Sequence, residues 1–213
     1  MRLLGAWGGS QWLLRLGWAE PGDAARRDEL SASEQERAAA LVSAADRAAY
    51  VAAHLLARDC ARAFLGSAEL GEWQQRCATC TGDRGRLHGR PSFSARPELA
   101  VSLAHSGHAV AALVGTAPCG VDVEVDRRIA LPRRMLSDAE NAWLAQSPAP
   151  QRDLLRLWCR KEALLKAAGG DDPAGIGVLD PTGPLDVIGD YRLVEFPWPD
   201  GVLVAALGDS GRR

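Results

Sequence analysis

Apolar and polar positions alternate in several short segments of the chain, which predicts β-strands. The alternation is clear at 12–16, and we interpret the opening stretch of residues 1–20 as the first strand. Residues 99–115 form two apolar runs that meet at Ser106 and Gly107, which predicts a hairpin-like pair of strands. Further short strands are predicted at 120–126, 185–189, 191–196 and 201–208.

Apolar residues recur at helical spacing in the segments 31–66, 132–146 and 151–170. Ser31 or Ser33 is the expected N-cap of the first segment, and Gly66 is its expected stop. Gly169 and Gly170 close the last segment. Between the first helical segment and the hairpin, residues 77–93 are dense in Gly, Arg and Cys, which is typical of a loop.

The order of these elements defines the expected architecture. One set of strands and helices is followed by a second set, which predicts an α+β fold made of two halves that join near residue 118. We therefore expect a domain at 1–118 and another at 119–213.

Composition and charge narrow the class of protein. The chain has 213 residues and a net charge of −2, so it can bury a core without disulfides and is not a polybasic nucleic-acid binder. Its first twenty residues are interrupted by Gly8, Gly9 and Arg15, so we predict neither a membrane span nor a signal peptide. The five cysteines are an odd number, which favours a cytoplasmic protein.

Lysine is almost absent from the chain. Of the 25 Lys and Arg residues only Lys161 and Lys166 are lysines, which leaves 23 arginines. Two lysines five residues apart are present in a chain that otherwise uses arginine as its basic residue. A compact ammonium group therefore has a use there, typically at a phosphate or in proton transfer, unless the spacing is chance.

Two carboxylates stand close together in the segment GVDVEVD. Asp122 and Glu124 are two residues apart on a predicted strand, so both side chains leave the same face. Such a pair repels unless a cation or bases neutralise it. A solvent-facing strand surface is the alternative.

The helix containing WCRKEALLK adds a third acid. Trp158, Glu162 and Lys166 lie along one helical face, and Lys161 is rotated by roughly 100° from it. The Glu162–Lys166 pair is either surface decoration or part of a set of oxygen ligands that suits Mg²⁺ beside a phosphate-binding ammonium group.

The order of GVDVE at 120–124 and WCRKEALLK at 158–166, with HGRP at 88–91 and LAHSG at 103–107 before them, resembles the 4′-phosphopantetheinyl transferases. The length resembles the monomeric Sfp-type enzymes. The resemblance implies two similar α/β subdomains in a pseudo-twofold arrangement, with the active site in the cleft between them. It places the coenzyme A nucleotide on residues 1–118 and the metal-binding acids on residues 119–213.

The same resemblance implies residue roles. The implied metal ligands are Asp122, Glu124 and Glu162, and catalysis is assigned to Asp122, Glu162 and Lys166. The implied coenzyme A ligands are Arg37, Arg47, Arg90, His105, Lys161 and Lys166. In this family the 4′-phosphopantetheine group passes from coenzyme A, with Mg²⁺, to a serine hydroxyl of an apo carrier protein. Adenosine 3′,5′-bisphosphate is the other product, and such carriers serve polyketide or nonribosomal peptide synthesis.

A mixed basic and apolar stretch follows the acidic strand. Similar enzymes contact an acidic carrier protein there, because basic rims steer such partners and apolar centres hold them. The expected contacts are Arg127, Arg128, Ile129, Leu131, Arg133, Arg134 and Met135. A solvated helix start with a buried stripe is the alternative, and neither nucleic acid nor membrane is an expected partner.

Three features keep alternatives open. Glu140 is either an exposed helix acid or a helper of the metal cluster. Cys77 and Cys80, with His88, supply too few ligands for a closed zinc site, so we interpret them as loop cysteines, with zinc or a disulfide as alternatives. A binding relative without turnover and a Mg²⁺-dependent diphosphate hydrolase are the competing functions.

Overall fold

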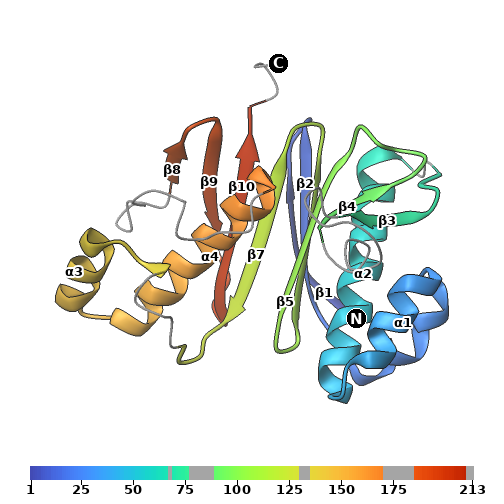
Figure 1. Cartoon of the computed structure of the whole chain (residues 1–213), viewed down its shortest axis with the longest axis horizontal. Coiled ribbons are helices and arrows are strands. Elements are labelled where there is room, and N and C mark those ends of the chain that lie inside the picture. The colour runs from blue at the N-terminus through green and yellow to red at the C-terminus, as the bar shows by residue number, and fades with distance from the viewer. Residues whose placement is uncertain (67–68, 77–88, 130–134, 170–184, 210–213) are drawn as a thin grey trace. The chain divides into compact units, whose positions relative to one another are not determined.

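The computed structural model describes residues 1–66, 69–76, 89–129, 135–169 and 185–209. It divides into two units, Met1–Ala117 (unit 1) and Pro118–Arg213 (unit 2). Both contain helices and antiparallel sheets, so the fold is mixed α+β (Figure 1). No helix in the described ranges is long and apolar enough to cross a lipid bilayer.

Unit 1 contains a four-stranded antiparallel sheet in the order β1-β2-β6-β5 and a separate two-stranded sheet of β3 and β4. Its strands are β1 Arg2–Gly8, β2 Trp12–Trp18, β3 Trp73–Arg76, β4 Arg90–Phe93, β5 Ala100–Ser106 and β6 Ala109–Gly115. Its helices are η1 Pro21–Glu29, α1 Ala32–Ala40 and α2 Ala44–Leu65.

The core of unit 1 lies between α2 and the four-stranded sheet. Alanines of α2, among them Ala49, Ala53 and Ala57, are fully buried against Val110 and Val114 of β6. Small side chains at these positions let the helix axis approach the sheet closely. The Ala-rich sequence therefore serves close packing, as well as high helix propensity.

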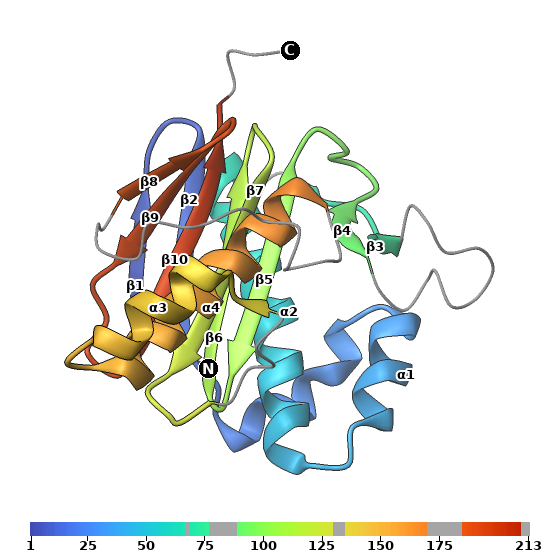
Figure 2. The same cartoon turned by 60° about the vertical axis from the view of Figure 1, so that its left-hand side comes forward.

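Unit 2 contains the sheet β7-β10-β9-β8, and α4 lies across one face of it (Figures 1 and 2). Its elements are β7 Cys119–Val125, α3 Asp138–Gln146, α4 Pro150–Ala168, β8 Leu185–Ile188, β9 Tyr191–Phe196 and β10 Gly201–Gly208. The core combines Leu155, Ala163 and Ala167 of α4 with Val202 and Val204 of β10.

The two units share an order of elements. In each, apart from β1, η1, β3 and β4 of unit 1 and β8 of unit 2, a strand is followed by a short helix, a long helix and a hairpin. The first of these strands pairs with the last. In unit 1 these strands are β2 and β6, and in unit 2 they are β7 and β10. The last strand also pairs with the one before it, β5 in unit 1 and β9 in unit 2.

Several local predictions are confirmed. Ser31 is the N-cap of α1, and Gly66 and Gly169 end α2 and α4 in the left-handed conformation that glycine adopts most readily. The predicted hairpin is present, with its turn at Gly107 and His108, one residue later than the predicted Ser106 and Gly107.

Other boundaries were predicted wrongly. The opening segment is a hairpin of two strands, β1 and β2, and the helical segment 31–66 is interrupted between Ala40 and Ala44. The helix predicted from 132 begins at Asp138, while 130–134 and most of the predicted loop 77–93 lie outside the described residues.

Candidate functional site

The acidic strand and the lysine helix of unit 2 are in direct contact at Gly120. A Cβ atom at Gly120 would lie 2.0 Å from the carbonyl oxygen of Ala163 and 2.5 Å from the backbone nitrogen of Ala167. Because side chains alternate along a strand, Asp122 and Glu124 leave the same face as Gly120, the face that α4 covers. Both are buried, so the solvent-facing alternative for this strand is wrong.

Lys166 and Asp122 form the closest contact of the site. The Lys166 Nζ atom lies 2.7 Å from Asp122 Oδ1 and also donates to the Val121 carbonyl oxygen at 3.2 Å. Asp122 Oδ2 is buried and has no hydrogen-bond partner within the described part of the chain. A buried acceptor left unsatisfied costs about 1–3 kcal/mol, so this oxygen is well suited to a further ligand.

The titratable groups of the site influence one another. Burial raises the pKa of Asp122, although Lys166 acts in the opposite direction. Burial opposes the ammonium form of Lys166, but the charge and hydrogen bond of Asp122 outweigh it and raise the pKa of Lys166. Burial also raises the pKa of Glu162, and the negative charges of Asp122 and Glu124 add to this shift. The three acids are therefore electrostatically coupled, with Lys166 as a shared counter-charge.

Glu124 is paired with a base from the segment that follows β7. Arg127 donates from Nη2 and Nε to Glu124 Oε2, at 3.0 and 3.3 Å. The arginine side chain is 52 % exposed, so solvent screens this ion pair. Bases thus offset the charge of both strand acids.

The carboxylates of this site are possible ligands for a divalent cation. Among the described residues no three His, Cys, Asp or Glu side chains form a ready-made metal site. The chemistry of the acids nevertheless fits Mg²⁺, which binds through one or two carboxylates and retains waters. The unpartnered Asp122 Oδ2 and the coupled carboxylate of Glu162 are the oxygens best placed for this role.

Lys161 does not point into this cluster. Its Nζ lies 3.0 Å from Glu140 Oε1, and the two side chains are 2 % and 0 % exposed. The ammonium group is buried within unit 2, and the implied contact of Lys161 with coenzyme A stays a prediction. Glu140 is buried, so the exposed alternative for it is wrong.

The other implied coenzyme A ligands lie in unit 1. Arg37 is exposed on α1, Arg90 is exposed at the start of β4, and His105 is exposed on β5. Arg47 is half-buried near the start of α2 and donates to the carbonyl oxygen of Leu41. The roles of these four residues in binding coenzyme A stay predictions.

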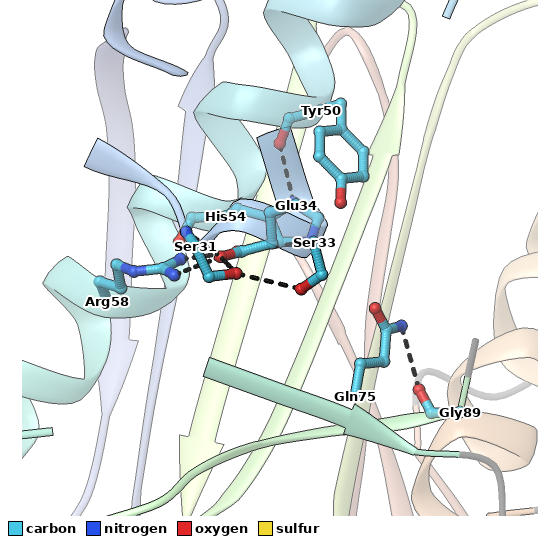
Figure 3. A network of polar contacts seen from close by, with 8 residues as sticks. All are labelled: Ser31, Ser33, Glu34, Tyr50, His54, Arg58, Gln75 and Gly89. Atoms are coloured by element: carbon cyan, nitrogen blue, oxygen red, sulfur yellow. Dashed lines mark hydrogen bonds and ion pairs between the residues drawn. The ribbon is translucent and has the colours of Figure 1, made fainter. Parts of the chain in front are cut away.

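A buried polar network lies in the same unit (Figure 3). Arg58 donates two hydrogen bonds to Glu34, at 2.9 and 2.6 Å, and its guanidinium group stacks over Trp73 at 5.1 Å. His54 donates from Nδ1 to the Tyr50 carbonyl oxygen at 2.9 Å, and its Nε2 is 4.0 Å from Glu34. Burial lowers the pKa of His54 to about 4, so the ring is neutral at pH 7.

The expected carrier-protein contacts are only partly described. Arg127 and Arg128 are exposed, whereas Ile129 packs against the core of unit 2 and Met135 is half-buried. Leu131, Arg133 and Arg134 lie outside the described residues, as do Cys77, Cys80 and His88. The described cysteines are Cys60, Cys119 and Cys159, and all three are buried.

Sequence reasoning missed the roles of Glu34, Arg58 and Gly120. A signal was present for the first, because Leu-Ser-x-x-Glu occurs at 30–34 and again at 136–140. In this capping box the glutamate accepts a hydrogen bond from the backbone of the serine. Pairing of the glutamate with a distant base needs the tertiary structure.

Part of the chain resembles a known family of proteins. Residues 118–185 match the model of the 4′-phosphopantetheinyl transferase superfamily. This part of the chain, which carries β7 and α4, is therefore similar to that superfamily, and the resemblance predicted from the sequence is confirmed.

Curated relatives agree with this assignment. The chain is 37 % identical over 90 residues to 4′-phosphopantetheinyl transferase AcpT of Salmonella typhi, covering 38 % of this chain and 46 % of the relative. It is 33 % identical over 86 residues to a 4′-phosphopantetheinyl transferase of Bacillus subtilis, covering 38 % of each. The matched region spans less than half the length of these relatives.

Proposed function

We propose that the chain transfers the 4′-phosphopantetheine group of coenzyme A to a serine hydroxyl of an apo carrier protein. The observation that carries the proposal is the contact of Lys166 with Asp122 at 2.7 Å, beside the electrostatically coupled Glu162. These three side chains come from the two motifs of the matched region. The names of the relatives support the same activity.

Asp122, Glu124 and Glu162 are the residues proposed to hold Mg²⁺. When bound, Mg²⁺ supplies positive charge that offsets the charge of a diphosphate. Lys166 and Arg127 already contact two of these carboxylates, so the proposal requires both bases to share them with the ion. The raised pKa of Lys166 keeps its ammonium group charged for this purpose.

The remaining chemistry belongs to side chains of α4. In the proposed reaction the serine oxygen forms a bond to the phosphorus that carries pantetheine. The bond from that phosphorus to the oxygen of adenosine 3′,5′-bisphosphate breaks. Glu162, whose pKa is raised, is the proposed acceptor of the serine proton, and the Lys166 ammonium offsets the charge that develops on the leaving oxygen.

The two units have different proposed tasks. Unit 1 supplies Arg37, Arg47, Arg90 and His105 for the phosphates and nucleotide of coenzyme A, since arginine forks suit peripheral phosphates. Unit 2 supplies the metal-binding acids and Lys166. The common order of elements supports the proposal that the units are two similar subdomains in a pseudo-twofold arrangement.

Intact-protein mass spectrometry tests this function. The chain is incubated with coenzyme A, MgCl₂ and an apo carrier domain, with a carrier whose modified serine is changed to alanine as the control. We expect the carrier to gain one phosphopantetheinyl group and the carrier with alanine in place of the modified serine to gain nothing. Phosphopantetheine released into solution would indicate a diphosphate hydrolase, and coenzyme A bound without turnover would indicate a binding relative.

A further inference from the structure

The only two lysines of the chain are both ion-paired, and both belong to α4. Lys161 contacts Glu140 at 3.0 Å, and Lys166 contacts Asp122 at 2.7 Å. Because an α-helix turns by about 100° per residue, positions five apart point in directions about 140° apart. The helix is therefore held by ionic contacts on two different sides.

Glu140 connects Lys161 to the first turn of α3. The Ser137 backbone N–H donates to Glu140 Oε2 at 2.6 Å, and the Glu140 N–H donates to Ser137 Oγ at 3.1 Å. This reciprocal capping box fixes the glutamate side chain. Lys161 thus binds to a carboxylate whose position the start of α3 already determines.

We propose that Lys161 and Glu140 form a positioning pair, which sets the rotation of α4 so that Glu162 and Lys166 face Asp122. This role rests on the proposed function. Glu162 follows Lys161 directly in the chain, so a rotation that moved one would move the other. Misplacement of a reacting group by about 1 Å can lower a rate about a hundredfold.

The buried site of the pair is compatible with a compact ammonium group at position 161. A guanidinium group carries five N–H donors in a rigid plane, and each needs a partner when buried, whereas an ammonium group is compact. In unit 1 the corresponding capping glutamate, Glu34, pairs with Arg58, whose side chain is 11 % exposed. At 2 % exposure, Lys161 occupies a site that suits the smaller cation.

Three variants of the full chain separate positioning from ligand binding. Lys161→Met removes the ammonium and keeps much of the side-chain volume. The double variant Lys161→Met with Glu140→Gln also removes the buried carboxylate and keeps an acceptor for the Ser137 N–H. Arg152→Met, an exposed base on the same helix, is the matched control. The measurements are kcat, KM for coenzyme A, and the urea midpoint of unfolding.

A positioning role predicts a specific pattern. In Lys161→Met the kcat per folded molecule falls at least about tenfold, while KM for coenzyme A stays within about twofold. The double variant regains most of the urea midpoint because no buried charge is left unpaired, but its kcat stays low because no ion pair fixes the rotation of α4, and Arg152→Met behaves as wild type. If Lys161→Met does not fold, the double variant still tests the proposal, which predicts wild-type KM with a kcat lowered at least about tenfold.

Two results would overturn the proposal. A raised KM for coenzyme A in both Lys161 variants would make Lys161 a ligand, and an unchanged kcat per folded molecule would make the pair merely structural. If the wild-type chain transfers nothing, the proposed function fails on its own. Titration with Mn²⁺ then decides the positioning role, which predicts weaker binding in both Lys161→Met and the double variant and unchanged binding in Arg152→Met.

Discussion

Each unit buries a capping glutamate against a base of its long helix, but the surroundings of the two pairs differ. In unit 1, Glu34 receives two hydrogen bonds from Arg58, and the neutral His54 lies beside it. In unit 2, Glu140 Oε1 lies 3.0 Å from Lys161 Nζ, and both side chains are fully buried. The same local device is thus built with a partly exposed guanidinium in one unit and a buried ammonium in the other.

This difference predicts how each ion pair responds to the loss of its base. The carboxylate of Glu34 has a titratable neighbour, because His54 can take up a proton if Arg58 is lost. Arg58 also reaches solvent, so its contribution to stability is moderated by water. The side chains of Lys161 and Glu140 are more deeply buried. Lys161 directly precedes Glu162, an acid of the proposed active site.

The largest effect should come from removing the base of each pair. Breaking a buried ion pair by deleting one partner costs about 3–5 kcal/mol, and we expect this for Lys161→Met. We expect about 2 kcal/mol for Arg58→Met at pH 7, and less as the pH falls, because His54 then protonates beside Glu34. Urea unfolding from pH 5 to 8 measures both, and equal losses at every pH would remove the distinction between the units.

Gly17 and Gly120 lie in the first strand of the motif that the two units share, β2 in unit 1 and β7 in unit 2. Gly120→Ala places a methyl group 2.0 Å from the Ala163 carbonyl oxygen, and we expect about 3 kcal/mol of destabilisation. Gly17→Ala meets the flexible Met1 side chain at 3.2 Å, so its expected cost is below about 1 kcal/mol. Thermal unfolding compares the two variants. A mild effect at Gly120 would mean that α4 does not pack closely on β7.

We expect a smaller effect on stability from the protonation of His54 as the pH falls. Its pKa is about 4 in the folded chain against an ordinary 6.5, so folding favours the neutral ring. The resulting stability is complete above pH 6.5 and is lost as the pH falls towards 4. The loss is at most about 3 kcal/mol.

His54→Gln should flatten this part of the pH profile of stability. The urea midpoint of wild type and variant is measured between pH 4 and 8, with His108→Gln, an exposed histidine of the same unit, as the control. Parallel profiles for wild type and His54→Gln would show that the ring titrates normally.

Sequence patterns predicted the local features of the fold better than its interruptions. Capping at Ser31 and termination at Gly66 follow from single residues, so they could be predicted. The break between α1 and α2 occurs within an Ala-rich stretch whose composition favours a continuous helix. The hairpin of β1 and β2 was missed because Gly8 and Gly9, which mark its turn, were interpreted only as an interruption of a membrane span.

The candidate site shows the same limit. Spacing placed Asp122 with Glu124 on one strand face and Glu162 with Lys166 on one helix face, whereas their roles came from the family resemblance. Spacing also rotated Lys161 away from the face of Lys166, but it could not identify the partner of Lys161. Only the distance to Glu140, a residue 21 positions earlier and on another helix, distinguishes their environments.

The central claim is that the coupled acids and Lys166 of unit 2 carry out phosphopantetheinyl transfer. The most direct test compares the intact mass of an apo carrier domain after incubation with coenzyme A, MgCl₂ and either wild type, Glu162→Gln or Asp153→Asn. Asp153 is an acid of the same helix outside the site, paired with Arg156. We predict modified carrier with wild type and Asp153→Asn, and unmodified carrier with Glu162→Gln. Full modification by Glu162→Gln would contradict the account.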